Sequence, residues 1–268
     1  MTPYKLFVFD LDGTLLTQDF RLTDDTLKAF NDIRDLGFRM TVATGRSYKS
    51  AKPFLDKLEI LEPMVFSNGA VFDNPDSGER EIISGSTLET ALITLMLLPD
   101  YQISAKFHLA TGELYKTNDT PWPDEGKHFE VGTIVPNLKA ELTEDPIKVV
   151  FHAESSEIEV FSKRLDEVLG KKSNVRLFRS HEHYVEMTNK NVSKGTAVKM
   201  LVEKLGVQPE EVITVGDQDN DFEMIRDFGL GVVVGHGTPN LLKVMNHQVS
   251  SPEDKGIEQL RDWVKAGC

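Results

Sequence analysis

In the first part of the chain, short apolar runs alternate with stretches that carry helix-capping residues. Residues 5–9 and 38–42 are rich in β-forming residues, and Thr23 can cap a helix between them. Apolar runs of this length are typical of strands buried on both faces of a parallel sheet. The alternation of strand and helix predicts an α/β fold with right-handed crossovers.

The same alternation continues beyond residue 42 and returns after Lys190. We expect a helix from Ser47, a third strand over 64–66, and a hairpin formed by 70–72 and 81–83 around the turn-rich residues 73–78. After Lys190 the expected elements are helices over 193–205, 220–227 and 255–266, and strands over 212–215 and 230–234. The two ends of the chain therefore predict one Rossmann-like, doubly wound parallel sheet.

The middle of the chain follows a different pattern. Its expected strands cover 103–108, 147–152, 175–179 and 184–188, and its expected helices cover 87–98 and 155–169. These strands are less apolar and come partly in runs, which favours an antiparallel sheet in an α+β domain. We predict a core formed by residues 1–84 and 190–268, with an α+β cap domain inserted at 85–189.

Composition and charge narrow the class of protein. The chain has 268 residues, of which 40% are hydrophobic and 27% charged, as in ordinary globular proteins with one large or two moderate domains. The net charge is −13 and no long run of Lys or Arg is present, so nucleic acid is not an expected partner. An acidic surface does not attract an anionic ligand, and a site for one would need a local cation.

The single cysteine, Cys268, excludes an internal disulfide, which fits a reducing compartment. The apolar run near the N-terminus is four residues long and ends at Asp10, so no signal peptide is expected. No apolar stretch approaches the roughly 18 residues of a membrane span. We expect a cytoplasmic protein without a membrane partner, and the sequence leaves the oligomeric state open.

Residues 9–14, Phe-Asp-Leu-Asp-Gly-Thr, place two carboxylates directly after the first predicted strand. Ligands of open α/β sheets bind at the carboxyl ends of the strands. Alternation along extended chain puts Asp10 and Asp12 on one side, about 7 Å apart along the backbone. Two anions this close need a cation or a shared proton between them. The pattern indicates a Mg²⁺ site with one carboxylate free to act as a nucleophile, although an Asp-rich turn is the plainer alternative.

Three further segments carry polar residues after strands or at a helix start. Thr44 follows the second strand, Lys194 lies in the first turn of a predicted helix, and Asp217 follows the strand over 212–215. Taken singly, Thr44 could be an N-cap, Lys194 a solvated lysine and Asp217 a turn residue. Their order and their shared position at element ends favour one common site.

In this order, Asp-X-Asp-Gly-Thr at 10–14, Thr44, Lys194 and Gly-Asp-X-X-Asn-Asp at 216–221 resemble the four motifs of the haloacid dehalogenase superfamily of phosphohydrolases. The long insert between the second and third motifs is similar to that of the Cof-type branch, subfamily IIB. The resemblance spans nearly the whole chain. It implies a Mg²⁺-dependent phosphatase that hydrolyses small phosphorylated metabolites, with sugar phosphates the expected substrates, through an aspartyl-phosphate intermediate.

The resemblance also implies a role for each matched residue. Asp10 is the expected nucleophile, and Asp12 the acid that protonates the leaving group and later activates water. The expected Mg²⁺ ligands are Asp10, the backbone carbonyl of Asp12, and Asp217. The expected phosphate-binding residues are Leu11, Thr44, Gly45, Lys194 and Asn220. Asp221 is expected to orient Lys194 or a metal-bound water, and Thr14 to fix the turn.

Candidates for contact with the rest of the substrate are Arg46, Asn68, Thr188, Asn189 and Lys190. The chain departs from relatives after the strand over 230–234, where Gly235-His236-Gly237 stands in place of the usual Gly-Asn-Ala, so the role of His236 stays open. Asp219 is an additional acid in the fourth motif, expected to cap the next helix. Two other functions stay open on the same scaffold: a phosphomutase using the same aspartyl-phosphate, and a catalytically inactive binding protein.

Overall fold

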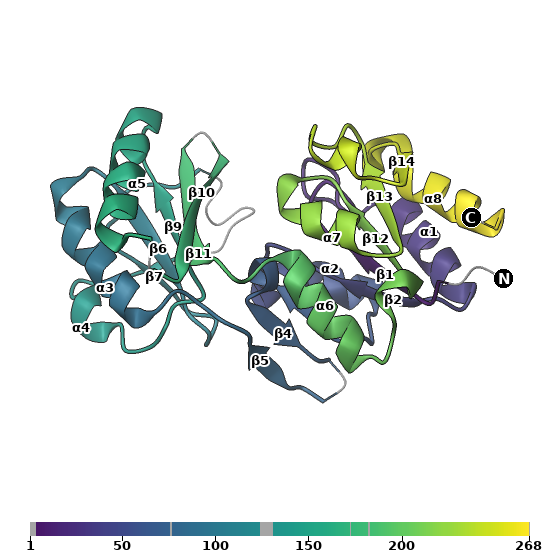
Figure 1. The fold of residues 1–268 in the computed structure, drawn as a ribbon, viewed down its shortest axis with the longest axis horizontal. Coiled ribbons are helices and arrows are strands. Elements are labelled where there is room, and N and C mark those ends of the chain that lie inside the picture. The colour runs from purple at the N-terminus through teal and green to yellow at the C-terminus, as the bar shows by residue number, and fades with distance from the viewer. Residues whose placement is uncertain (1–3, 76, 124–130, 172, 182, 268) are drawn as a thin grey trace. The chain divides into compact units, whose positions relative to one another are not determined.

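The computed structural model describes residues 4–75, 77–123, 131–171, 173–181 and 183–267. The chain divides into two compact units (Figure 1). The core unit consists of Met1–Glu81 and Ser193–Cys268, and the inserted unit of Ile82–Val192. Cys268 and the turn residue 76 lie outside the described residues.

A five-stranded parallel sheet forms the centre of the core unit, in the order β14-β13-β12-β1-β2. These strands are β1 (Leu6–Phe9), β2 (Arg39–Val42), β12 (Val212–Gly216), β13 (Leu230–Val234) and β14 (His247–Val249). The helices are α1 (Asp24–Asp35), α2 (Tyr48–Leu58), α6 (Lys194–Lys204), α7 (Phe222–Asp227) and α8 (Gly256–Lys265). In Figure 1, α1 and α8 lie together on one face of the sheet, and α6 and α7 on the other. The predicted doubly wound sheet is therefore confirmed.

Side-chain caps start three of the helices where the sequence predicts a start. The hydroxyl of Thr23 accepts a hydrogen bond from the amide of Thr26 at the start of α1, and Ser47 caps α2 in the same way. Ser193 and Thr196 form a reciprocal capping box at the start of α6. This box fixes the position of Lys194, the first residue of that helix.

The third predicted strand has a neighbour on each side, and its bridge to the parallel sheet is parallel, as expected. β3 (Met64–Phe66) pairs antiparallel with β4 (Val71–Asp73), and β5 (Arg80–Ile82) completes a separate three-stranded sheet. A single bridge between Ala43 and Val65 joins β3 to the parallel sheet. The chain reverses direction immediately after β3, which turns the next strand back along it.

The inserted unit contains a six-stranded sheet in the order β10-β11-β9-β6-β7-β8. The strands are β6 (Ser104–His108), β7 (Leu114–Lys116), β8 (Thr133–Ile134), β9 (Lys148–His152), β10 (Val175–His181) and β11 (Tyr184–Asn189). The pairings are antiparallel except between β7 and β8. This confirms the predicted antiparallel sheet, while β7, β8 and the core strand β14 were not predicted from the sequence.

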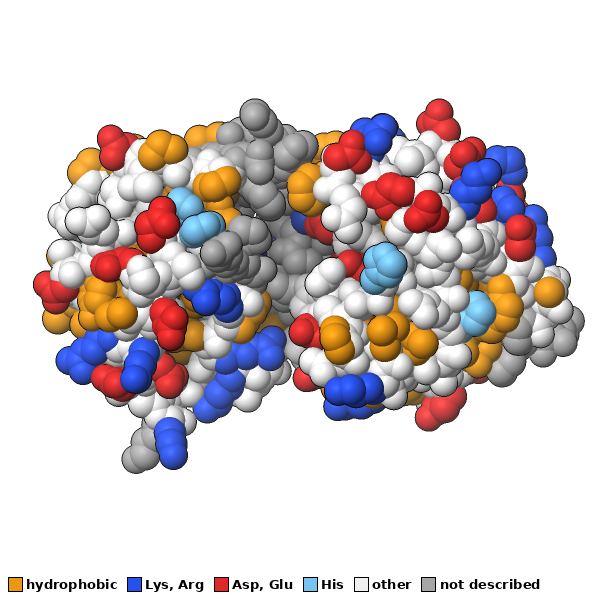
Figure 2. Space-filling view, turned by 90° about the horizontal axis from the view of Figure 1, so that it is seen from above, with side chains coloured by type: hydrophobic (Ala, Val, Ile, Leu, Met, Phe, Trp, Pro, Cys, Tyr) orange, Lys and Arg blue, Asp and Glu red, His pale blue; other side chains and the backbone are white. Residues whose placement is uncertain are grey.

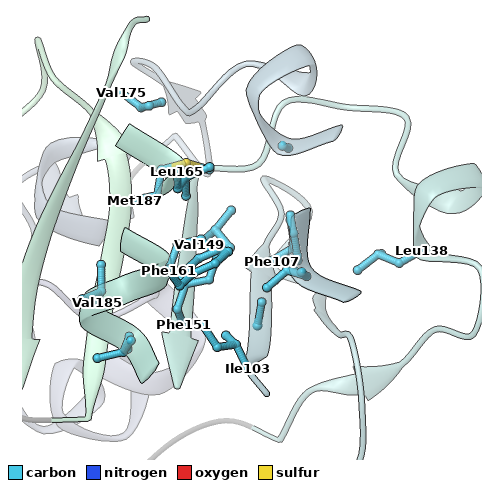
Figure 3. Packing of buried hydrophobic residues seen from close by; sticks show 14 of the residues in the cluster. Ile103, Phe107, Leu138, Val149, Phe151, Phe161, Leu165, Val175, Val185 and Met187 are labelled. Atoms are coloured by element: carbon cyan, nitrogen blue, oxygen red, sulfur yellow. The ribbon is translucent and has the colours of Figure 1, made fainter. Parts of the chain in front are cut away.

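The helices of the inserted unit are α3 (Leu88–Leu97), α4 (Leu138–Glu141) and α5 (Ser155–Leu169). They pack on one face of the sheet over an apolar core (Figure 3). The rings of Phe151 in β9 and Phe161 in α5 meet there with centroids 5.0 Å apart. The inserted unit thus has a hydrophobic core of its own.

Short 3₁₀ helices occupy Ser67–Gly69, Leu98–Asp100, Pro209–Glu211, Asp219–Asp221, Leu241–Lys243 and Pro252–Asp254. Acidic and basic side chains are mixed over the visible face of each unit (Figure 2). Within the described part of the chain, none of the helices combines the length and the apolar character that crossing a bilayer requires.

Candidate active site

Two neighbouring parallel strands bring the first and fourth motifs together. Asp10 directly follows β1, and Asp217 directly follows β12. Phe9 lies opposite Val215, and the amide of Asp10 donates to the carbonyl of Val215 at 2.9 Å. Both carboxylates therefore lie at the carboxyl ends of the central strands, where α/β sheets bind ligands.

A buried ammonium lies among these carboxylates. The Nζ atom of Lys194 donates to Asp10 Oδ1 at 2.6 Å and to Asp221 Oδ1 at 2.7 Å. The side chains of Lys194 and Asp221 are fully buried, and that of Asp10 is nearly so. Oxygens of Asp10, Asp217 and Asp221 lie within 4.8 Å of one another. Three acids thus lie around one ammonium, which donates to two of them, and all four side chains are largely buried.

Burial and this excess of negative charge raise the pKa values of two of the carboxyl groups. Burial, followed by the charge of Asp221, raises the pKa of Asp217 to about 6, despite hydrogen bonds from Gln218 and Thr14 that lower it. Burial raises the pKa of Asp10 well above its ordinary value, and the charge of Lys194 only partly offsets this. Burial lowers the pKa of Lys194, but the two carboxylates outweigh it and the net pKa is raised. The ammonium is therefore charged, and the carboxylates remain short of positive charge.

The oxygen atoms that remain available indicate where a metal would bind. Asp221 is saturated, because its second oxygen accepts the backbone amides of Asp217 at 3.0 Å and Gln218 at 3.1 Å. Asp10 Oδ2 has no hydrogen-bond partner among the residues that the structure describes. An oxygen-only, negatively charged donor set of this kind fits Mg²⁺. Asp221 contacts Lys194 directly, and its role in orienting Lys194 or a metal-bound water stays a prediction.

Thr14 and Gly13 fix the position of Asp217. The hydroxyl of Thr14 donates to Asp217 Oδ1 at 3.1 Å, and the side-chain amide of Gln218 donates to Asp217 Oδ2 at 2.8 Å. Gly13 has a positive φ of 77°, and a Cβ there would overlap the carboxylate of Asp217. The turn after Asp12 therefore requires glycine for two reasons, its backbone angle and its contact with Asp217.

Asp12 has a different cationic partner from Asp10. The Nε of Arg46 donates to both of its oxygens, at 3.0 and 2.9 Å, and an Nη donates at 2.6 Å. The guanidinium lies 5.2 Å from the ring of Phe20 and 5.1 Å from that of Phe54. Arg46, predicted as a candidate for substrate contact, is thus committed to Asp12 in this structure.

Thr44, Gly45 and Asn220 lie around Asn68. The Nδ2 of Asn220 donates to Asn68 Oδ1 at 3.0 Å, and a Cβ built on Gly45 would lie 3.1 Å from the same oxygen. Thr44 is buried, and its hydroxyl accepts the amide of Arg46 at 3.1 Å. Leu11 is also buried, in the loop after β1.

The three candidates near the return linker each have a partner within the inserted unit. Asn189 is buried and donates to Ser84 Oγ at 2.6 Å and to the carbonyl of Gly85 at 3.1 Å. Lys190 donates to the carbonyl of Ser173 at 2.7 Å. Thr188 accepts from Arg176 at 3.4 Å. Their role in substrate contact stays a prediction.

Asp219 does not cap a helix as predicted. Gln218 is the N-cap of the 3₁₀ turn Asp219–Asp221, and Asp221 is that of α7. Asp219 Oδ1 instead accepts from Thr238 at 2.6 Å and from Asn240 at 3.3 Å. Its carboxylate thereby ties the fourth motif to the loop after β13. His236, between two glycines of positive φ in that loop, is exposed.

The comparisons with known proteins decide the family. Residues 7–260 match the family of haloacid dehalogenase-like hydrolases. The chain belongs to this family. The resemblance seen in the four motifs is thereby confirmed, as is the expectation that the protein is a hydrolase.

Relatives match this hydrolase along most of its length. It is 28% identical over 262 residues to the 5-amino-6-(5-phospho-D-ribitylamino)uracil phosphatase YitU of Bacillus subtilis, covering 95% of each chain. It is 25% identical to the HMP-PP phosphatase of Enterobacter sp. (strain 638), covering 91% of this chain and 88% of the other.

Solved structures of the family share its fold. A haloacid dehalogenase-like hydrolase from Bacteroides thetaiotaomicron superposes with a TM-score of 0.88 at 21% identity, covering 97% of this chain and 99% of the other. A subclass IIB sugar phosphatase, BT4131, superposes with a TM-score of 0.78 at 19% identity, with the same coverage. Both agree with the predicted architecture.

Sequence reasoning missed the partners that hold the hydrolase's motif residues in place. The pair Asp12–Arg46 joins positions 34 residues apart, and the pair Asn68–Asn220 joins positions 152 apart. The stacking of Phe20 and Phe54 on Arg46 was also not predicted. A single sequence carries no signal for such pairs.

Proposed function

We propose that the protein is a Mg²⁺-dependent phosphatase that hydrolyses phosphate monoesters of small metabolites, and that sugar phosphates are its substrates. The observation that carries this proposal is the buried cluster of Asp10, Lys194, Asp217 and Asp221 at the carboxyl ends of β1 and β12. A cluster with more carboxylates than ammoniums costs free energy to bury. A metal cation that binds there would offset the excess charge.

In the proposed reaction, a carboxylate oxygen of Asp10 attacks phosphorus, and the ester P–O bond breaks as the new P–O bond forms. Asp12 gives its proton to the leaving alkoxide and then takes one from the water that attacks the aspartyl-phosphate. That water releases inorganic phosphate and restores Asp10. Arg46 fixes the carboxylate of Asp12 through three hydrogen bonds, which suits the base step; in the acid step, the proton of Asp12 would occupy an oxygen that Arg46 has released.

The metal would be held by Asp10, Asp217 and the backbone carbonyl of Asp12. When bound, it supplies positive charge to the phosphoryl oxygens and orients the ester for in-line attack. Thr14 and Gln218 would hold Asp217 in position for it.

The remaining phosphoryl oxygens would be bound by the hydroxyl of Thr44, the amides of Leu11 and Gly45, and the side chains of Lys194 and Asn220. Lys194 is suited to this because two of its three N–H groups donate to Asp10 and Asp221. These two hydrogen bonds fix the direction of the third N–H group, which remains available to a phosphoryl oxygen. Such preorganised donors stabilise charge that develops in the transition state.

The names of the relatives support a small phosphorylated metabolite as the substrate. One relative is a phosphatase of a phosphorylated ribitylaminouracil, another of HMP-PP, and a structural neighbour is a sugar phosphatase. Their reactions share the phosphoryl group and differ in the rest of the molecule. We also propose a cytoplasmic location, where such metabolites occur.

A chromogenic phosphate monoester, assayed with and without Mg²⁺, tests the proposal. We expect hydrolysis with Mg²⁺, none in excess chelator, and weaker activity with Ca²⁺, which tolerates looser coordination. Full activity in chelator would contradict the metal role, and no hydrolysis of any monoester would contradict the phosphatase. Phosphoryl transfer between sugar phosphates that depends on a bisphosphate activator would identify a phosphomutase instead.

A further inference from the structure

The turn after β3 holds three consecutive residues in the left-handed region of backbone space. The φ angles are 52° at Ser67, 57° at Asn68 and 102° at Gly69. Left-handed backbone strains residues other than glycine, and Asn tolerates it better than most. All three residues are buried, with Asn68 only 9% exposed. Such strain persists where the surroundings enforce it, and it concentrates at functional sites.

This turn touches the loops of three of the four motifs. The amide of Ser67 donates to the carbonyl of Arg46 at 2.9 Å, and that of Asn68 to the carbonyl of Thr44 at 3.0 Å. At Gly69, a Cβ would overlap the carbonyl oxygen of Ser193, the residue that caps Lys194's helix. The turn therefore packs directly against the second and third motifs.

The side chain of Asn68 completes the connection to the fourth motif. Its Oδ1 accepts from Asn220 Nδ2 at 3.0 Å. Its Nδ2 would lie 3.4 Å from a Cβ built on Gly45, so the amide group lies between Gly45 and Asn220. Among the described residues, no hydrogen-bond acceptor is bound to this Nδ2. This donor is therefore available to an oxygen atom of a ligand.

We propose that Asn68 is a further phosphoryl-binding residue, which donates from Nδ2 to a phosphoryl oxygen and orients Asn220 through Oδ1. This inference rests on the proposed phosphatase function. This role gives the strained turn a function, because its left-handed backbone places the side-chain amide of Asn68 between Gly45 and Asn220, two of the proposed phosphate-binding residues. It assigns to the turn after β3 a role that none of the four motifs includes.

The test measures the inhibition constant of inorganic phosphate, and kcat and KM for a chromogenic monoester, in two variants. Asn68→Asp keeps the shape and the acceptor for Asn220 but replaces the donor with an anion. We expect its phosphate inhibition constant to rise by about ten- to a hundredfold, as for loss of a hydrogen bond to a charged group. Asn68→Gly allows the same backbone and removes both interactions, and we expect a rise of about tenfold.

Glu59→Gly is the matched control, because it introduces glycine at another left-handed residue, the exposed C-cap of α2. It should leave the phosphate inhibition constant, kcat and KM unchanged. If Asn68 merely held Asn220, Asn68→Asp would bind phosphate as the wild type does, and this would overturn the donor role. Wild-type constants in both variants would overturn the whole inference. Absence of hydrolysis and of phosphate binding in the wild type would instead contradict the phosphatase itself.

Discussion

The core unit and the inserted unit differ in what they bury. In the core unit, the carboxylates of Asp10, Asp217 and Asp221 surround the single ammonium of Lys194. In the inserted unit, the buried charged side chains among the described residues are Lys106 and Lys116, beside an otherwise apolar core. The core unit therefore concentrates an excess of carboxylates in one buried cluster, whereas the inserted unit is built around an apolar core.

The difference follows from the two kinds of sheet. A parallel sheet gathers the loops after β1, β2 and β12 at one edge, so residues far apart in sequence share one site. The antiparallel sheet of the inserted unit distributes its loops to both ends. Because unbalanced buried charge destabilises a fold, the carboxylate cluster indicates a cation-binding site rather than a source of stability. The chemistry is thus assigned to the core unit.

The largest expected effect comes from Asp10→Asn, which keeps the shape of the side chain and removes the attacking anion. Turnover of a chromogenic monoester should fall by about four orders of magnitude or more. Asp56→Asn, which changes an exposed carboxylate paired with Lys52, is the matched control and should retain activity. Near-wild-type turnover in Asp10→Asn would show that Asp10 is not the nucleophile.

Lys194→Met tests the electrostatic side of the comparison. Without the ammonium, three buried carboxylates face one another, and we expect the free energy of unfolding to fall by about 3–5 kcal/mol in chelator. Denaturant unfolding of wild type and variant measures the difference. Mg²⁺ should recover part of the loss, because it binds the same carboxylates. A variant as stable as the wild type in chelator would show that the cluster is not short of positive charge.

The pH dependence of the metal-free protein should show the same imbalance. Burial raises the pKa of Asp217 from 3.8 to about 6, so the folded state holds this proton more tightly than the unfolded state does. Its contribution to stability is present below about pH 4 and is lost as pH rises through 6, by roughly 3 kcal/mol at most. Asp10 acts in the same direction, and the ammonium of Lys194 opposes both.

Unfolding in chelator between pH 4 and pH 8 measures this slope. Asp217→Asn should reduce the loss of stability without abolishing it, because Asp10 still titrates. An unchanged slope in the variant would assign the dependence to other groups.

The smallest effect concerns the inserted unit. The proposed phosphoryl-binding residues carry no information about the rest of the substrate, so we expect the inserted unit to select it. Replacing residues 85–189 with a short flexible linker should lower discrimination among sugar phosphates by about tenfold, while hydrolysis of a small generic ester continues. A substrate panel measures both. Unchanged selectivity would show that the inserted unit does not choose the substrate.

The sequence was sufficient to predict which motif residues lie together and insufficient to predict which side chains hold them in place. Asp10 and Asp217 could be placed together because both follow apolar runs typical of parallel strands. Thr14 and Asp217 are 203 residues apart, and nothing local marks them as partners. The tight turn after β3 was missed although Asn68-Gly69 is an Asn-Gly pair, a dipeptide typical of turns that need positive φ angles.

The central claim is that Asp10 becomes phosphorylated during turnover. Quenching the enzyme during steady-state hydrolysis and reducing it with borohydride converts an acyl phosphate to the corresponding alcohol, which peptide mass spectrometry can locate. The account predicts homoserine at position 10, in an amount that depends on substrate and Mg²⁺. Homoserine at another carboxylate, or none while hydrolysis proceeds, would contradict it.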